Sequence, residues 1–102
     1  MAKKLFAVLR ERGPRWNDAE PMERQEDWRR HADYMNALVA EGFALLGGPL
    51  LGTPEVLIVV AASDEGEIEE RLAQDCWSVG QLLRTLWIRP WWLRLGSLPG
   101  GS

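Results

Sequence analysis

The stretch Glu55-Val-Leu-Ile-Val-Val-Ala-Ala62 decides the fold of this chain. It holds seven consecutive apolar residues, many of them β-branched, with Pro54 before it and Ser63-Asp-Glu after it. This pattern predicts a buried strand followed by a helix that has Ser63 as its N-cap. Ile68 and Leu72 lie four positions apart and give that helix one buried edge.

The segments before this strand follow a similar plan. An apolar run over residues 4–10 predicts a first strand, and a loop rich in polar residues and proline follows over 11–21. No Pro or Gly interrupts residues 22–41, and Gly42 is a typical helix stop, so we expect a helix there. Residues 43–49 then predict a second strand that ends in a turn.

The segments after the second helix are shorter. A brief turn region is expected after Asp75-Cys76-Trp77. A last strand is expected over residues 84–89, ending at Pro90 and resuming from Trp92 to Leu95. Residues 1–96 therefore form one domain, with a frayed C-terminal tail over 97–102.

The order strand-helix-strand-strand-helix-strand is that of the ferredoxin-like fold. It predicts an α+β domain in which a four-stranded antiparallel sheet carries both helices on one face. The expected strands do not alternate between apolar and polar residues, so the uncovered face would also be apolar. Because monomers rarely expose such a patch, we expect a homodimer that packs sheet to sheet.

Composition and charge exclude several kinds of protein. A net charge of −3, with basic and acidic residues interleaved, gives no footprint for nucleic acid. The apolar run Leu5–Leu9 is too short for a secretion signal or a membrane span. The single cysteine, Cys76, rules out an internal disulfide and fits a reducing compartment, so a cytoplasmic location is expected.

No motif calls for a metal or a cofactor. One His and one Cys cannot make a ligand cluster at metal spacing, so no metal site is expected. The chain has no dinucleotide-binding or phosphate-binding glycine motif, and Gly47-Gly48-Pro49 is interpreted as a strand-end turn.

His31 is the only histidine, and it falls inside the apolar face of the expected first helix. A polar ring in that place needs a hydrogen-bond partner. Asp75 is the best candidate, because it follows the second helix at the end where the helix dipole disfavours an acid. Such a pair would fix the ring tautomer and make a general base or acid, although a satisfied core histidine is the commoner case. The apolar stripe consists of Trp28, His31, Ala32, Met35, Leu38 and Val39.

Three further features have two interpretations each. Cys76 is either a nucleophile or, as its acidic neighbour favours, a small buried residue. Arg10, Arg12, Arg15 and Trp16 around the first loop either bind an anionic or aromatic ligand or form a solvated loop. The six tryptophans either enlarge the core and interface or wall a ligand pocket, and Trp87, Trp91 and Trp92 are left open between interface and pocket.

Several segments together resemble the YCII-related family of small dimeric ferredoxin-like proteins. They are His31-Ala-Asp-Tyr34-Met-Asn-Ala-Leu38, Leu46-Gly-Gly-Pro49, the apolar strand with its Ser-Asp-Glu helix start, and Asp75-Cys76-Trp77. The resemblance implies a His31–Asp75 active-site pair in a pocket near the dimer interface. It also points to a substrate-binding set made of Arg10, Trp16, Tyr34, Gly48, Pro49 and Trp77. Cys76 departs from the family, which usually has proline there.

Three functions follow as alternatives. The first is a cofactor-independent acid–base enzyme, by analogy a lyase, isomerase or dehydrochlorinase acting on a small aromatic metabolite. The second is a binding module that holds a small molecule without turnover. The third is a structural homodimer in which the pair only satisfies the core. A His31–Asp75 contact beside an open pocket would favour the first two, and a sealed ring would exclude the enzyme.

Overall fold

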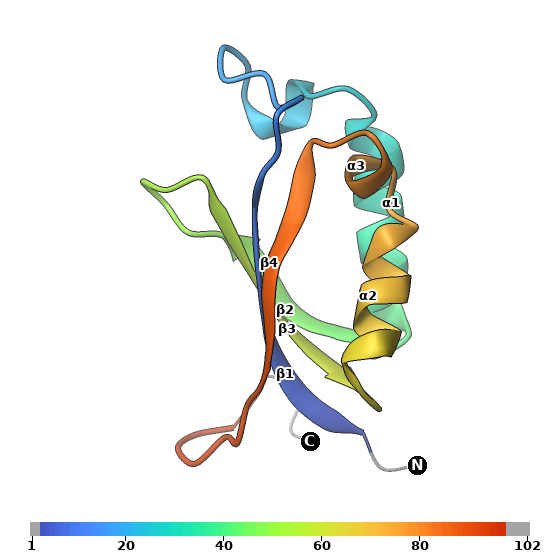
Figure 1. Cartoon of the computed structure of the whole chain (residues 1–102), viewed down its shortest axis with the longest axis vertical. Helices are drawn as coiled ribbons and strands as arrows, with labels where there is room; N and C mark the ends of the chain where they lie inside the picture. The colour runs from blue at the N-terminus through green and yellow to red at the C-terminus, as the bar shows by residue number, and fades with distance from the viewer. Residues whose placement is uncertain (1–2, 98–102) are drawn as a thin grey trace.

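A four-stranded antiparallel sheet forms one layer of the molecule, with its strands in the order β2-β3-β1-β4 (Figure 1). The computed structural model describes residues 3–97. Long apolar runs pair at the centre of the sheet, where β1 and β3 lie side by side. The strands are β1 (Lys4–Arg12), β2 (Ala44–Pro49), β3 (Glu55–Ala62) and β4 (Leu83–Pro90).

The helices form the second layer, on one face of the sheet (Figure 1). They are α1 (Trp28–Ala40), α2 (Glu65–Ala73) and the short α3 (Cys76–Val79), with a 3₁₀ turn, η1 (Met22–Arg24), before α1. The α+β class and the antiparallel sheet are thereby confirmed, and the arrangement is compatible with a ferredoxin-like fold. The third helix was not expected from the sequence.

The core lies between the two layers. In β1, Phe6, Val8 and Arg10 are buried, while the residues between them are only half-buried. Phe6 and Val8 pack in one cluster with Leu38 of α1 and Ile68 of α2. Arg10 continues the same buried row, so the strand brings a charged side chain under the helices. This placement matters for the site.

The first helix is shorter than residues 22–41. Gln25 is extended after η1, with ψ 153°, and Asp27 adopts a left-handed conformation with φ 60°, so the chain turns before α1 begins at Trp28. Val39 is exposed at the end of the predicted apolar stripe. The predicted helix included residues 22–27 because no Pro or Gly in the sequence marks the break before Trp28.

Three other boundaries differ from expectation. The N-cap of α2 is Asp64, whose carboxylate accepts the Glu67 N–H at 2.8 Å, while the Ser63 N–H donates to the Glu67 side chain. The expected turn after Asp75 is the helix α3. No strand resumes over residues 92–95. Ser97 of the predicted tail is exposed, and residues 98–102 lie outside the described part of the chain.

None of the described helices covers the opposite face of the sheet (Figure 1). The register puts Leu9 of β1 between Leu57 of β3 and Trp87 of β4, all on this face. Leu5 and Ala7 of β1 lie on the same face as Leu9, and both are half-buried. We call this surface, made of Leu5, Ala7, Leu9, Leu57, Val59, Ala61 and Trp87, the open face; all of these residues are half-buried except Val59, which is buried. Within residues 3–97, no helix has the length and apolar character needed to cross a membrane.

Candidate active site

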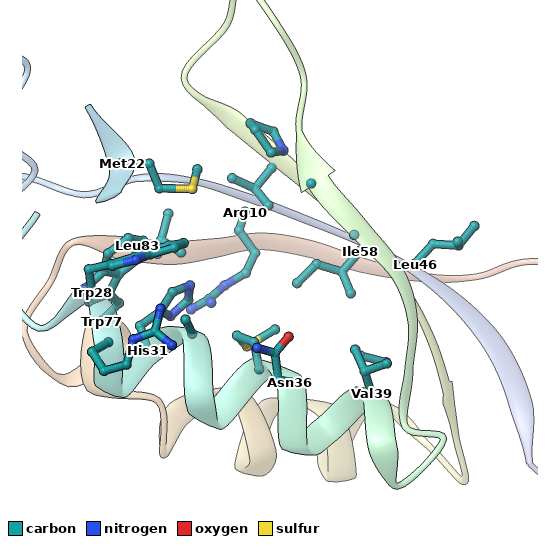
Figure 2. Close-up of a pocket in the computed structure, with 18 of the residues that line it drawn as sticks. Arg10, Met22, Trp28, His31, Asn36, Val39, Leu46, Ile58, Trp77 and Leu83 are labelled. Atoms are coloured by element: carbon teal, nitrogen blue, oxygen red, sulfur yellow. The ribbon is translucent and has the colours of Figure 1, made fainter. Parts of the chain in front are cut away.

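A cavity of about 420 Å³ lies between α1, the segment before it and the helix-facing side of the sheet (Figure 2). Most of its wall is apolar, and three of its side chains are tryptophans. Four charged or polar residues also line it. Arg10 is buried and His31 is half-buried, whereas Arg29 and Asn36 are exposed on α1. The apolar and aromatic wall consists of Trp16, Met22, Trp28, Ala32, Met35, Val39, Ala44, Leu46, Gly47, Gly48, Pro49, Val56, Ile58, Trp77 and Leu83.

His31 and Asp75 meet inside the molecule. The Nδ1 atom of His31 lies 2.7 Å from Oδ2 of Asp75. The Asp75 side chain is 0 % exposed and the His31 side chain 11 %. An ionised carboxylate only accepts hydrogen bonds, so Nδ1 donates to it and Nε2 carries the free lone pair. His31 lines the cavity, whereas Asp75 lies behind it.

Asp75 owes its position to α3. It is the N-cap of this helix, and its Oδ1 accepts the Trp77 N–H at 3.3 Å. Asp75 follows the C-terminal end of α2, as expected, but it also stands at the N-terminus of α3, where an acid is favourable. The two carboxylate oxygens thus serve different partners, one the helix and one His31.

Trp77 fixes the plane of the imidazole. Its ring stacks on His31 with a centroid distance of 3.8 Å and an interplanar angle of 7°. The indole N–H donates to the Glu26 carbonyl at 2.6 Å, which holds the indole in turn. Trp16 packs edge-on against Trp77 at 5.4 Å, and Trp28 lies 5.8 Å from it. A ring held by stacking and by Asp75 is preorganised for proton transfer.

Arg10 approaches the same carboxylate from β1. Its Nη1 lies 3.7 Å from Asp75 Oδ2, and its side chain is 1 % exposed. Nη2 donates to Ser78 Oγ at 2.5 Å, and Nε donates to Thr85 Oγ1 at 3.3 Å. Burial lowers the pKa of the guanidinium, and the charge of Asp75 opposes that effect. Arginine nevertheless stays charged in proteins at neutral pH.

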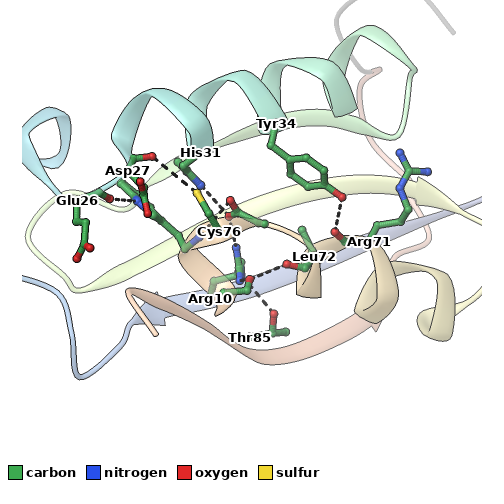
Figure 3. Close-up of polar contacts among 12 residues, drawn as sticks. Arg10, Glu26, Asp27, His31, Tyr34, Arg71, Leu72, Cys76 and Thr85 are labelled. Carbon is green, nitrogen blue, oxygen red and sulfur yellow. Dashed lines mark hydrogen bonds and ion pairs between the residues drawn. The ribbon is translucent and has the colours of Figure 1, made fainter. Parts of the chain in front are cut away.

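The fold brings most of the predicted site residues to one place. Arg10, Trp16, Gly48, Pro49 and Trp77 line the cavity together with His31. Tyr34 is the exception. Its hydroxyl donates to the Arg71 carbonyl at 2.7 Å, which links α1 to α2 away from the cavity (Figure 3).

The predicted substrate-binding set omitted the cavity residues Met22 and Trp28 and the groups that hold Arg10. Trp28 precedes His31 by three positions on one helix, which puts both on the same face and was a usable signal. Ser78 and Thr85 gave no such signal, because they meet Arg10 only through the folding of α3 and β4 onto β1.

Cys76 is half-buried beside the pair, with its Sγ 3.8 Å from the Asp27 carbonyl. Burial raises the pKa of its thiol, and the Asp75 carboxylate raises it further. A thiol with a raised pKa is a poor nucleophile at neutral pH. The interpretation as a small packed residue is therefore favoured over a nucleophile.

The remaining tryptophans do not wall the cavity. Trp87 lies on the open face, paired with Leu9, and the Arg89 guanidinium stands 5.6 Å from its ring centre. Trp91 and Trp92 follow β4 and are exposed, Trp92 by 78 %. In the described residues, these three rings therefore belong to the surface away from His31.

No family model matches this chain, and no curated protein matches it significantly. Within residues 3–97, no three His, Cys, Asp or Glu side chains are grouped so that they could hold a metal ion.

Proposed function

We propose that this protein is a cofactor-independent acid–base enzyme acting on a small, planar, aromatic metabolite. One observation carries the proposal: His31 Nδ1 contacts a fully buried carboxylate at 2.7 Å while its ring lines a cavity. His31 is the group that takes and gives the proton. Asp75 is a positioning residue, because it orients the imidazole from behind and does not line the cavity.

The proton balance of such a step is simple. Nε2 of His31 accepts a proton from a carbon or oxygen acid of the substrate, and the electron pair stays on the substrate as an enolate or phenolate. The imidazolium that forms is stabilised by Asp75. The proton then returns to another atom of the substrate, which is isomerisation. Alternatively the electron pair expels a leaving group such as chloride and the imidazolium releases its proton to water, which is elimination.

The wall of the cavity suggests the kind of substrate. Its volume of about 420 Å³ falls in the range of small-molecule sites. Trp16, Trp28 and Trp77 offer ring faces and edges to a flat molecule, and Met22 and Met35 adapt to its outline. The small number of polar groups favours a substrate with few charges.

A binding module without turnover is the second candidate. The observation that favours it is the largely apolar wall. Such a pocket can bind a ligand even if His31 and Asp75 transfer no proton. Both candidates predict weaker binding when the site is altered, so only turnover separates them.

Three wider proposals accompany this function. The element order and the sheet order support a ferredoxin-like domain of the YCII-related family, to which the Asp75-Cys76-Trp77 and Leu46–Pro49 segments are similar. The apolar open face supports a sheet-to-sheet homodimer. The lone thiol of Cys76 supports a reducing, cytoplasmic setting.

The test is a thermal-shift screen of small aromatic acids, phenols and halogenated ring compounds, followed by product analysis of each hit. For a converted hit, His31→Ala should lower kcat by about 100-fold or more, the usual contribution of a positioned general base. Asp75→Asn should lower kcat while still capping α3, because Asn is as good an N-cap as Asp.

Tyr34→Phe is the matched control, because it removes a polar group of α1 that lies away from the cavity. Its kcat should equal that of the wild type. Hits that bind but are never converted would favour the binding module, and equal turnover by His31→Ala would exclude His31 as the base.

A further inference from the structure

Two side chains of opposite charge type are buried at the cavity, Arg10 in its lining and Asp75 behind it. Asp75 is 0 % exposed and Arg10 is 1 % exposed, with 3.7 Å between Nη1 and Oδ2. A buried carboxylate is unfavourable unless a cation compensates it. Asp75 has two candidates for that role, the guanidinium of Arg10 and an imidazolium at His31.

The choice between these two cations decides whether His31 can act as a base. If His31 were the only partner, the carboxylate would favour the imidazolium, and Nε2 would already hold a proton. With a guanidinium beside it, the carboxylate is compensated before the imidazole is protonated. His31 then remains neutral, with the lone pair of Nε2 available.

The surroundings of Arg10 suit such a role. Ser78 of α3 and Thr85 of β4 hold its guanidinium from two elements, and the Ser78 hydroxyl donates its own hydrogen bond to the Leu72 carbonyl at 2.6 Å. Nη1 is the one buried side-chain polar atom without a hydrogen-bond partner in the described residues. It faces Asp75 at a distance that allows ion pairing but no hydrogen bond. Arg10 therefore acts on the pair by its charge.

We propose that Arg10 is a positioning residue that keeps the buried Asp75 ionised and His31 neutral, so that Nε2 can accept a proton. This inference rests on the proposed acid–base function of the same pair. It changes the predicted role of Arg10, because a side chain that is 1 % exposed and tied to Ser78 and Thr85 is not free to grip a substrate.

The other charged and titratable groups around His31 are few and mostly paired. On its own helix, Arg29 pairs with Asp33 at 3.5 Å and Arg30 pairs with Asp27 at 3.8 Å, all of them near or at the surface. From α3 come Asp75 and the Cys76 thiol, and from β1 comes Arg10. Glu26, in the segment before α1, contacts Trp77 only through its backbone carbonyl. Arg10 is thus the buried cation nearest to the pair.

The chain contains a single histidine, so nitrogen-15 NMR of the imidazole reports on this ring alone. The variants are Arg10→Met, which removes the charge, and Arg10→Lys, which keeps it. In Arg10→Met the ring should become protonated at higher pH than in the wild type, because a positive charge near the pair is lost. Arg10→Lys should lie closer to the wild type. Arg84→Met is the control, since it removes the same charge from an exposed pair with Glu11.

An unchanged or lowered midpoint in folded Arg10→Met overturns the inference. If that variant does not fold, Ser78→Ala decides the question, with Arg10→Lys as the variant that keeps the charge. Ser78→Ala removes the hydroxyl that accepts from Nη2, so the guanidinium is held less firmly beside Asp75 and the midpoint should also rise. An unmoved midpoint in folded Ser78→Ala overturns the inference. The measurement needs no substrate, so a rise without any turnover would sustain the role of Arg10 and reject the enzyme, and turnover without a rise would do the reverse.

Discussion

Asp75 joins three parts of the molecule through one side chain. One oxygen caps α3, and the other accepts a hydrogen bond from Nδ1 of His31 and faces Arg10. These roles require a buried carboxylate, and aspartate is almost never fully buried unless its charge is paired. The acid is tolerated because a helix N-terminus, a ring N–H and a guanidinium all compensate its charge. A single residue therefore couples the local fold of residues 75–79 to the chemistry proposed for the cavity.

Cys76 occupies a backbone position at the start of α3 that would also suit proline. It is the first residue of α3. Proline is favoured at this position because the backbone N–H that it lacks would have no partner within the helix. Asp75 before it has φ −67° and ψ 134°, which suits a residue that precedes proline. Cys76→Pro should therefore fold and gain about 0.4–1 kcal/mol in the free energy of unfolding.

Denaturant unfolding of the two proteins measures this change. Trp77→Pro is not a fair control, because Trp77 is buried, so Ser97→Pro serves at an exposed position without regular structure. A loss of more than about 1 kcal/mol in Cys76→Pro would show that the thiol packing outweighs the backbone gain.

At the scale of elements, the first loop depends on Gln25. This side chain is buried, and its Nε2 donates to the Asn17 carbonyl at 2.7 Å and the Glu20 carbonyl at 3.0 Å. Its Oε1 accepts the Asn17 N–H at 2.9 Å. The loop carries Trp16, which packs on Trp77, so Gln25 holds one wall of the cavity in place.

Gln25→Ala should loosen this wall. The loop carbonyls and the Asn17 N–H lose their partner, which costs about 1–3 kcal/mol of stability. Hydrogen exchange measured by mass spectrometry should rise over residues 13–27 and stay unchanged in β3. Gln74→Ala is the matched control, because Gln74 is an exposed glutamine whose one side-chain bond lies within α2. Equal exchange in the loop of both variants would mean that Trp16 and its neighbours hold the loop without Gln25.

At the scale of the whole molecule, the open face is the feature that a lone domain leaves unexplained. Its apolar rows run through β1, β3 and β4, and the chain supplies no described element to cover them. We expect the protein to elute at twice its 11.6 kDa mass at micromolar concentration. Light scattering after size exclusion measures this directly.

Leu9→Lys should give a folded monomer, because it places a charge at the centre of the open face between Leu57 and Trp87. Val79→Lys is the control, since Val79 is 73 % exposed on α3, away from this face. A wild type that stays monomeric at micromolar concentration would contradict the dimer, and the open face would then need another partner.

Much of the molecule followed from local pattern. The strand over residues 55–62 was predicted with its observed bounds. An apolar run of this length that is rich in β-branched residues favours a buried strand over a helix. The helix boundaries were less accurate, since the left-handed turn at Asp27 falls on a residue that carries no obvious breaker. The helix α3 is a single turn stabilised by its cap, and one turn is too short to leave a periodic signal.

The sequence by itself determined the α+β class and the apolar sheet, and it singled out His31 as a polar ring on an apolar face. It could do so because hydrophobic periodicity is local and because a lone histidine on an apolar face needs a partner. Asp75 was named as the partner of His31 mainly on the family resemblance. Only the tertiary structure decided that Arg10 stands behind that pair and that Tyr34 turns away from it. These placements depend on strands and helices far apart in the chain, whose contacts are fixed by packing and not by the spacing of residues.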